Sequence, residues 1–155
     1  GAARKQPMQQ SPLNHSISIV IPVYNSGEIL PKLAERLSQV LPQVAASFEL
    51  VLVNDGSRDH SWDEILRLAE KYDWIKGICL MRNYGQHNAL LCGIRAARHE
   101  IIVTMDDDLQ HPPEEIPKLL AKLNEGFDVA YGAPEKENHG VLRDAASQLT
   151  KIVLQ

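Results

Sequence analysis

The sequence predicts an α/β fold with one mostly parallel β-sheet and helices on both of its faces. Short apolar runs rich in β-branched residues, which are typical of buried strands, recur five times along the chain. Segments with the apolar spacing of amphipathic helices lie between these runs, and strands that alternate with helices of this kind form parallel sheets. The five predicted strands cover residues 16–24, 48–55, 74–81, 100–106 and 127–132.

The helices after the first two strands are predicted by apolar residues that recur every three or four positions. In the first helix these residues are Leu30, Leu33, Ala34, Leu37 and Leu41. In the second they are Trp62, Ile65, Leu66, Ala69 and Tyr72. Ser61 and Glu64 stand at the spacing of a capping box, so we expect the second helix to begin at Ser61.

Three further helices are expected. The third covers about residues 86–98. The fourth begins at Pro113 or Pro117, because proline suits the first turn of a helix and not its interior, and it ends at Gly126. A terminal helix is predicted within residues 141–155.

Composition and charge bound the class of protein. The chain of 155 residues can form one domain with a real core, and its net charge of −4 argues against a general nucleic-acid binder. No apolar run approaches the roughly 20 residues that span a bilayer. Residues 1–15 are polar and are expected to form a disordered leader before a domain of residues 16–155. Cys79 and Cys92 are predicted to be small buried residues of a reducing compartment.

Polar residues follow four consecutive predicted strands. In open parallel sheets, ligands bind beyond the carboxyl ends of the strands, so we expect these residues to line one crevice. They are Pro22, Tyr24 and Asn25 after the first strand, Asn54, Asp55, Gly56 and Ser57 after the second, Arg82, Asn83, Tyr84 and Gly85 after the third, and Asp106, Asp107, Asp108 and Gln110 after the fourth.

The acidic run after the fourth strand has two interpretations. Mg²⁺ or Mn²⁺ prefers oxygen ligands, typically one or two carboxylates together with substrate phosphates. Residues two apart can project to one side, so Asp106 and Asp108 could face one cation, and Gln110 continues that spacing. Alternatively, the aspartates favour the N-terminus of the next helix, which is worth about 0.3–1 kcal/mol each. The run alone leaves both interpretations open.

The other strand ends suit a nucleotide. The Asp-Gly-Ser sequence at Asp55 is turn chemistry, but the carboxylate of Asp55 could also accept an N–H from a nucleobase, and Tyr24 could stack on that base. Arg82, the flexible Gly85 and the N-terminus of the following helix all suit a diphosphate.

These motifs, in this order, resemble the inverting family 2 glycosyltransferases with a GT-A fold. The segments "IVIPVYNS", "VNDGSRD" and "MDDDLQHPPEEI" match three family motifs in register. Within the family, "RNYGQHNAL" and "EGFDVAYG" are similar to the polyprenyl-phosphate sugar transferases, which include dolichyl-phosphate mannose synthases and bacterial undecaprenyl-phosphate glucosyl and aminoarabinose transferases. The resemblance covers residues 16–155.

The resemblance implies a Rossmann-like GT-A domain that binds a nucleotide sugar. The implied reaction is metal-dependent and inverting, and it moves the sugar from a donor, expected to be UDP-linked, to a polyprenyl phosphate. Asp106, Asp108 and Arg143 are the expected catalytic residues, and Mg²⁺ or Mn²⁺ is the expected cofactor, held by Asp106, Asp108 and Gln110. Arg143 and Ser147 are expected to hold the acceptor phosphate. The expected donor-binding residues are Pro22, Tyr24, Asn25, Asp55, Arg82, Gly85, Asp106 and Asp107.

Two positions depart from the family pattern. Asn54 stands where many relatives have an aspartate. Gly132 is followed by Ala133 and Pro134 where relatives usually carry an arginine, and Lys136 could substitute for it. We also expect the acceptor-side half of such enzymes to be missing from this chain, and we expect the complete enzyme to work at the cytoplasmic face of a membrane.

The sequence also bears on three other functions. A truncated transferase could bind the nucleotide sugar without turning it over. A phosphoacceptor signalling domain needs an aspartate after its third strand, whereas the third strand here ends in "MRNYG". A dinucleotide oxidoreductase is disfavoured because no G-x-G-x-x-G follows the first strand.

Overall fold

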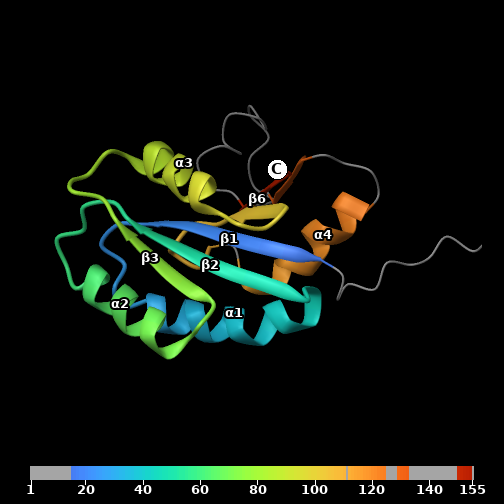
Figure 1. The fold of residues 1–155 in the computed structure, drawn as a ribbon, viewed down its shortest axis with the longest axis horizontal. Coiled ribbons are helices and arrows are strands. Elements are labelled where there is room, and N and C mark those ends of the chain that lie inside the picture. The colour runs from blue at the N-terminus through green and yellow to red at the C-terminus, as the bar shows by residue number, and fades with distance from the viewer. Residues whose placement is uncertain (1–14, 111, 125–128, 133–149, 155) are drawn as a thin grey trace, which may run out of the picture.

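The computed structural model describes residues 15–110, 112–124, 129–132 and 150–154, and in these ranges one sheet has the strand order β3-β2-β1-β4-β6-β5 (Figure 1). The strands are β1 (Ser16–Val23), β2 (Ser47–Asn54), β3 (Ile75–Cys79), β4 (Ile101–Thr104), β5 (Val129–Gly132) and β6 (Thr150–Leu154). The pairs β1–β2, β1–β4 and β2–β3 are parallel, and β6 runs antiparallel to both β4 and β5. The predicted mostly parallel sheet is confirmed.

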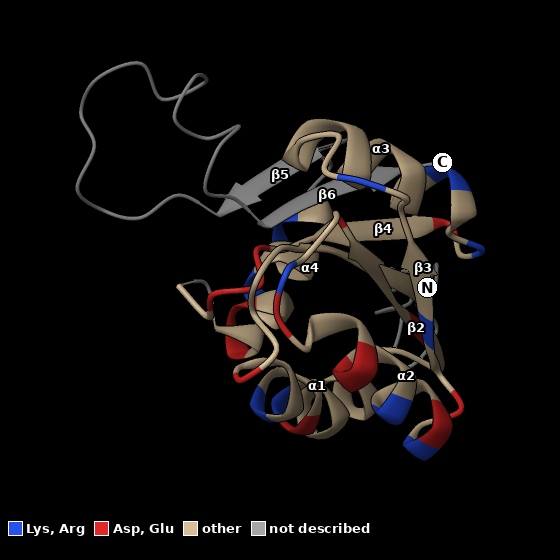
Figure 2. Ribbon diagram, turned by 90° about the vertical axis from the view of Figure 1, so that its left-hand side faces the viewer, with Lys and Arg blue, Asp and Glu red and all other residues tan. Residues whose placement is uncertain are grey.

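Helices cover both faces of this sheet, as the sequence predicts. The helical elements are α1 (Leu30–Val44), α2 (Ser61–Lys71), α3 (Gln86–Ala96), the 3₁₀ turn η2 (Pro113–Glu115) and α4 (Ile116–Asn124). Figure 2 shows the sheet between α3 on one side and α1 and α2 on the other. Buried residues of α4 join the core on the side of α1 and α2. In the part of the chain that the structure describes, no helix is long and apolar enough to cross a membrane.

The side chains of the central strands alternate between two cores. Ile17, Ile19 and Ile21 of β1 pack toward α1 and α2, whereas Val20 packs toward α3. All four are fully buried, as expected for a strand that is covered on both faces. The apolar run of the first predicted strand therefore serves two packed layers.

Close packing of α3 on the sheet requires a glycine. A Cβ atom on Gly93 would lie 2.3 Å from Cγ1 of Val20 and 3.0 Å from Cγ2 of Val53, closer than carbon atoms approach without movement. Gly93 therefore lets α3 lie directly against β1 and β2. This contact places the first turn of α3 beside the carboxyl ends of the strands.

A buried carboxylate ties the other end of α3 to the sheet. Glu49 of β2 is 1% exposed and accepts hydrogen bonds from Ser18 Oγ at 2.6 Å and from the Arg98 backbone N–H at 2.6 Å. The Lys76 ammonium lies 3.1 Å from Glu49 and also donates to the carbonyl of Ala96, at the end of α3. Burial alone would raise the pKa of Glu49, but the bonds from Ser18, Arg98 and Lys76 outweigh it and lower that pKa.

The predicted terminal helix is wrong where the structure describes it. Residues Thr150–Leu154 form β6, in which Ile152 pairs with Val103 and Val153 with Ile102. The segment "TKIVL" carries three β-branched residues, which favour a strand, and β6 pairs with strands on both of its sides. The rest of the predicted helix lies outside the described residues.

Two smaller predictions are also wrong. The start of α2 at Ser61 is as predicted, but no capping box forms, because Glu64 pairs with Arg67 and the hydroxyl of Ser61 bonds to Asp59. Cys79 is exposed and Cys92 is half-buried. Cys79 ends β3, the strand at the edge of the sheet, so its apolar neighbours in the sequence do not bury it.

Candidate functional site

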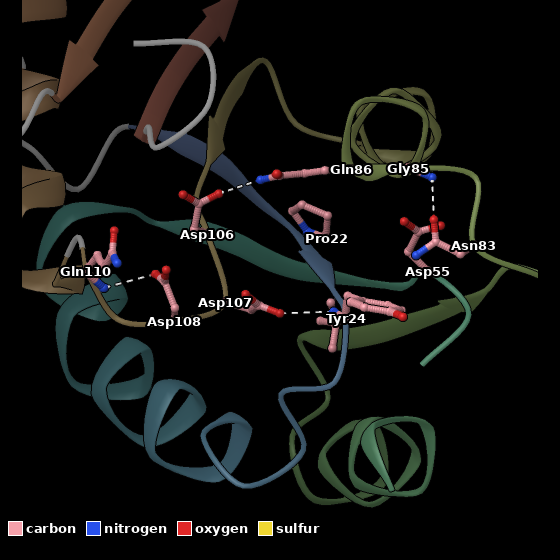
Figure 3. Close-up of a pocket in the computed structure, with 11 residues that line it drawn as sticks. Pro22, Tyr24, Asp55, Asn83, Gly85, Gln86, Asp106, Asp107, Asp108 and Gln110 are labelled. Carbon is pink, nitrogen blue, oxygen red and sulfur yellow. Dashed lines mark hydrogen bonds between the residues drawn. The ribbon is translucent and has the colours of Figure 1, made fainter. Parts of the chain in front are cut away.

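A cavity of about 440 Å³ lies at the carboxyl ends of the parallel strands (Figure 3). The polar ends of β1, β2 and β4 and the first turn of α3 meet there, as the sequence predicts for a crevice at this edge of the sheet. Its walls are formed by Pro22, Val23, Tyr24, Asp55, Asn83, Gly85, Gln86, Asp106, Asp107, Asp108 and Gln110.

The three aspartates after β4 point to three different partners, as Figure 3 shows. Asp106 Oδ1 accepts a hydrogen bond of 2.8 Å from the side-chain amide of Gln86. Asp107 Oδ2 accepts one from the backbone N–H of Tyr24, at 3.0 Å. Asp108 Oδ1 accepts one from the backbone N–H of Gln110, at 3.1 Å. Hydrogen-bond donors therefore offset part of the repulsion within this acidic run.

The pKa of Asp107 lies above its ordinary value. Burial raises its pKa, and the neighbouring negative charge of Asp108 raises it further. Hydrogen bonds from Ser26 and from the Tyr24 backbone act in the opposite direction without outweighing burial. The Asp107 carboxylate thus faces the protein more than the solvent.

The loop between β1 and α1 carries Tyr24 and is held by the β2–α2 loop. Asn25 has a positive φ of 52°, its N–H donates to Ser57 Oγ at 3.0 Å, and its side-chain oxygen accepts from the Arg58 N–H at 2.8 Å. The N–H of Gly27 donates to the Asp59 carboxylate at 3.1 Å. These bonds hold the backbone of the loop, while the residue Tyr24 stays 45% exposed and lines the cavity.

Asp55 joins the end of β2 to the β3–α3 loop. It is 3% exposed, and its Oδ1 accepts a hydrogen bond of 2.8 Å from the backbone N–H of Tyr84. Gly56 adopts a φ of +69°, and a Cβ there would lie only 2.4 Å from the backbone nitrogen of Asn83. The loop after β3 can therefore pack directly over the loop after β2 only because residue 56 is glycine.

Most of the residues predicted for the site lie together. The cavity brings together Pro22, Tyr24, Asp55, Gly85, Asp106, Asp107, Asp108 and Gln110. Asn25 lines a neighbouring hollow instead, and the guanidinium of Arg82 lies over the ring of Tyr84 at 4.9 Å from its centroid. The predicted acceptor residues Arg143 and Ser147 lie outside the described residues.

Gln86 is a cavity residue that the sequence analysis missed. It is the first residue of α3 and follows Gly85, whose φ is +94°. The position of Gln86 in the sequence could have predicted this, because the first turn of a helix that follows a strand end faces the same crevice as the strand ends.

The cavity offers the type of ligand atom that a divalent cation needs. Asp106, Asp108 and Gln110 all line it, and carboxylate and amide oxygens are the ligands that Mg²⁺ and Mn²⁺ prefer. Among the described residues, however, no three His, Cys, Asp or Glu side chains are grouped closely enough to hold a metal alone. The donor set therefore suits a cation that shares its coordination with the phosphates of a bound ligand.

Comparison with known proteins identifies relatives over most of the chain. The family described as "Glycosyl transferase family 2" matches residues 18–152. Undecaprenyl-phosphate 4-deoxy-4-formamido-L-arabinose transferases of Salmonella choleraesuis (strain SC-B67) and Salmonella paratyphi B (strain ATCC BAA-1250 / SPB7) are each 39% identical over 140 residues. The match covers 90% of this chain and 43% of each relative, so the chain spans less than half the length of these curated relatives.

Solved structures share the fold at lower identity. The mannosyltransferase PcManGT from Pyrobaculum calidifontis, in complex with GDP-Man and Mn²⁺, superposes with a TM-score of 0.69 at 18% identity, covering 95% of this chain and 48% of that one. S. aureus TarS 1-349 in complex with UDP gives a TM-score of 0.65 at 24% identity, covering 90% of this chain and 46% of that one.

Proposed function

We propose a function for this chain on the premise that it belongs to glycosyl transferase family 2. It binds the UDP-sugar donor of a transferase that moves the sugar to a polyprenyl phosphate, with a divalent cation and with inversion at the sugar carbon. The observation that carries this proposal is the single cavity that gathers Tyr24 and Asp55 with the three aspartates after β4. The 39% identity to transferases that are named for undecaprenyl phosphate supports the acceptor class.

The nucleoside is bound at the end of the cavity formed by β1 and β2. Asp55 Oδ1 is engaged by the backbone of Tyr84, so the carboxylate is held in one orientation and its other oxygen can accept an N–H from a nucleobase. Tyr24, which is 45% exposed and lines the cavity, would offer its ring for stacking on that base. A buried, fixed acceptor of this kind discriminates between bases better than a mobile one, because a mismatched base leaves it unpaired.

The diphosphate is bound at the end of the cavity formed by β4 and α3. Asp106, Asp108 and Gln110 would hold the cation together with the phosphates, and the cation would offset the negative charge on the departing nucleoside diphosphate. Gln86 already donates to Asp106 and so holds this carboxylate toward α3. The first turn of α3 faces the same space and can receive an anionic group.

The acceptor reaction needs no general base. A phosphate monoester has a second pKa near 6, so at neutral pH a lipid phosphate is already mostly an anionic nucleophile. Its oxygen forms a bond to the anomeric carbon while the bond from that carbon to the diphosphate oxygen breaks on the opposite face, which inverts the configuration. Arg143 and Ser147 are our proposed partners for the acceptor phosphate, and the planar guanidinium of an arginine can hold a phosphate through two parallel hydrogen bonds.

Sugar transfer tests this proposal. A protein that extends this chain to the length of its relatives is incubated with UDP-sugars, Mn²⁺ and either undecaprenyl phosphate or a free sugar as the acceptor. We expect glycosylated lipid phosphate as the product. Glycosylation of a free sugar or protein hydroxyl without use of the lipid phosphate would overturn the acceptor assignment. Donor binding without transfer to any acceptor would favour a nucleotide-sugar-binding module.

A further inference from the structure

Asp107 lies in the wall of the cavity but is bonded to a different loop from its two neighbours. Its Oδ2 accepts the N–H of Tyr24 at 3.0 Å and the hydroxyl of Ser26 at 2.5 Å. Asp106 and Asp108 are bonded instead to α3 and to their own turn. One oxygen of Asp107 is therefore occupied by two protein donors that come from the β1–α1 loop.

The bond to Ser26 continues into a longer chain of contacts. The backbone N–H of Ser26 donates to Ser61 Oγ at 3.0 Å, and that hydroxyl donates to Asp59 Oδ1 at 2.5 Å. The strand-end loops of β4, β1 and β2 are thus joined in series through Asp107, Ser26 and Ser61. Tyr24, which is 45% exposed, is joined to this chain of contacts through its backbone N–H, which donates to Asp107.

We propose that Asp107 is a positioning residue that holds Tyr24 for the nucleoside, and that it does not bind the cation or the diphosphate. This inference rests on the proposed function, because it divides the residues of that donor site between two tasks. Asp106 and Asp108 serve the diphosphate end. Asp107 holds the backbone of Tyr24, and so places the Tyr24 ring relative to the diphosphate end of the cavity. This positioning role takes the place of the direct contact with the donor that the sequence suggested for Asp107.

Charge and hydrogen bonding separate the two roles of Asp107. If Asp107 were a cation ligand, its negative charge would add to the attraction for Mn²⁺, so both asparagine and alanine should reduce the gain in UDP affinity that Mn²⁺ gives. A positioning residue needs only an acceptor for one N–H and one O–H, and the carbonyl oxygen of asparagine has two lone pairs. Asp107→Asn should therefore preserve the function of the residue, and Asp107→Ala should remove it.

The experiment measures the affinity of the 155-residue chain for uridine, which has no phosphate, and for UDP with and without Mn²⁺. We expect Asp107→Ala to weaken uridine binding about tenfold, as the loss of about 1–1.5 kcal/mol of hydrogen bonding implies. Asp107→Asn should stay within about threefold of the unmutated chain, and the factor by which Mn²⁺ strengthens UDP binding should be unchanged in both. Ser26→Ala should weaken uridine binding less than Asp107→Ala, and the double variant no more than Asp107→Ala alone.

Exposed Asp73, at the opposite end of the sheet, provides the matched controls Asp73→Asn and Asp73→Ala. The proposal is overturned if Asp107→Asn is as harmful as Asp107→Ala and only the effect of Mn²⁺ is lost, because Asp107 would then be a cation ligand. Amide exchange of Tyr24 gives a second measurement that needs no nucleotide. Asp107→Ala should speed this exchange about tenfold, and an unchanged rate would also overturn the proposal. Failure of the unmutated chain to bind uridine or UDP would instead refute the proposed function.

Discussion

Replacing Glu49 by glutamine should destabilise the fold and change how its stability depends on pH. The side chain keeps its size, and its carbonyl oxygen can still accept from Ser18 Oγ and from the Arg98 N–H. The ion pairs with Lys76 at 3.1 Å and with the Arg98 guanidinium at 3.4 Å are lost. Glu49→Gln therefore leaves the cations of Lys76 and Arg98 without the carboxylate with which they pair.

The loss of unfolding free energy depends on how well water can solvate the two cations. Removing one partner of a buried ion pair costs about 3–5 kcal/mol when the other charge stays buried. Here the Lys76 and Arg98 side chains are 39% and 71% exposed, so both can be hydrated once Glu49 is neutral. We therefore expect Glu49→Gln to lower the free energy of unfolding by about 2–3 kcal/mol near neutral pH.

The pH dependence has a definite sign. The pKa of Glu49 is lower in the folded chain than its ordinary value of 4.5. Its ionised form therefore contributes stability that is fully present above about 4.5 and is lost as the pH falls through the lower, folded-state pKa. The difference in unfolding free energy between the unmutated chain and Glu49→Gln should be constant near neutral pH and should shrink below that value.

Urea unfolding, followed by circular dichroism at several pH values, measures both effects. The matched control is Glu70→Gln, which changes an exposed glutamate of α2. The reasoning is refuted if Glu49→Gln lies within about 0.5 kcal/mol of this control at neutral pH, or if its cost does not decrease in acid.

The remaining predictions concern packing and the donor site. Gly93→Ala should destabilise the chain by about 1–3 kcal/mol in urea unfolding, because its Cβ would lie 2.3 Å from Val20; an unchanged midpoint would contradict the described packing of α3. Amide exchange in residues 85–88 should be fast in the free chain and should slow when UDP-sugar binds, because Gly85 has open space around it; strong protection without ligand would argue against a closing loop. In a protein that extends this chain to the length of its relatives, Arg143→Ala should reduce transfer to lipid phosphate at least about tenfold with donor affinity unchanged, and equal losses in both would place Arg143 at the donor instead.

The sequence predicts the parallel strands and the crevice well because both follow from local patterns. The apolar pattern of residues 16–24 predicts a buried strand. The rule that ligands bind beyond the strand ends predicts from the sequence alone that Asp55 and Asp106 lie close together. The position of β6 is different. Its place between β4 and β5 depends on pairing with strands elsewhere in the sequence, which no local pattern shows, and the helix predicted for residues 150–154 is wrong.

The contacts of individual site residues also could not be predicted from local sequence patterns. Asp106, Asp107 and Asp108 are chemically identical in the sequence, and only the fold gives Asp107 a backbone partner 83 residues earlier in the chain. The sequence places the cation of Arg82 at a strand end. In the structure its guanidinium lies over the ring of Tyr84, and Arg82 does not line the cavity. The sequence therefore predicted which residues meet at the cavity, and the role of each of them stays a prediction.

Calorimetric titration of this chain with UDP, with and without Mn²⁺, tests the central claim most directly. We expect UDP to bind in both conditions and at least about tenfold more tightly with Mn²⁺, because the cation would link the diphosphate to the carboxylates of the cavity. Asp108→Asn should remove most of that gain while retaining the binding seen without metal, and Asp73→Asn should behave like the unmutated chain. Equal affinity for UDP with and without Mn²⁺ in the unmutated chain would contradict the account.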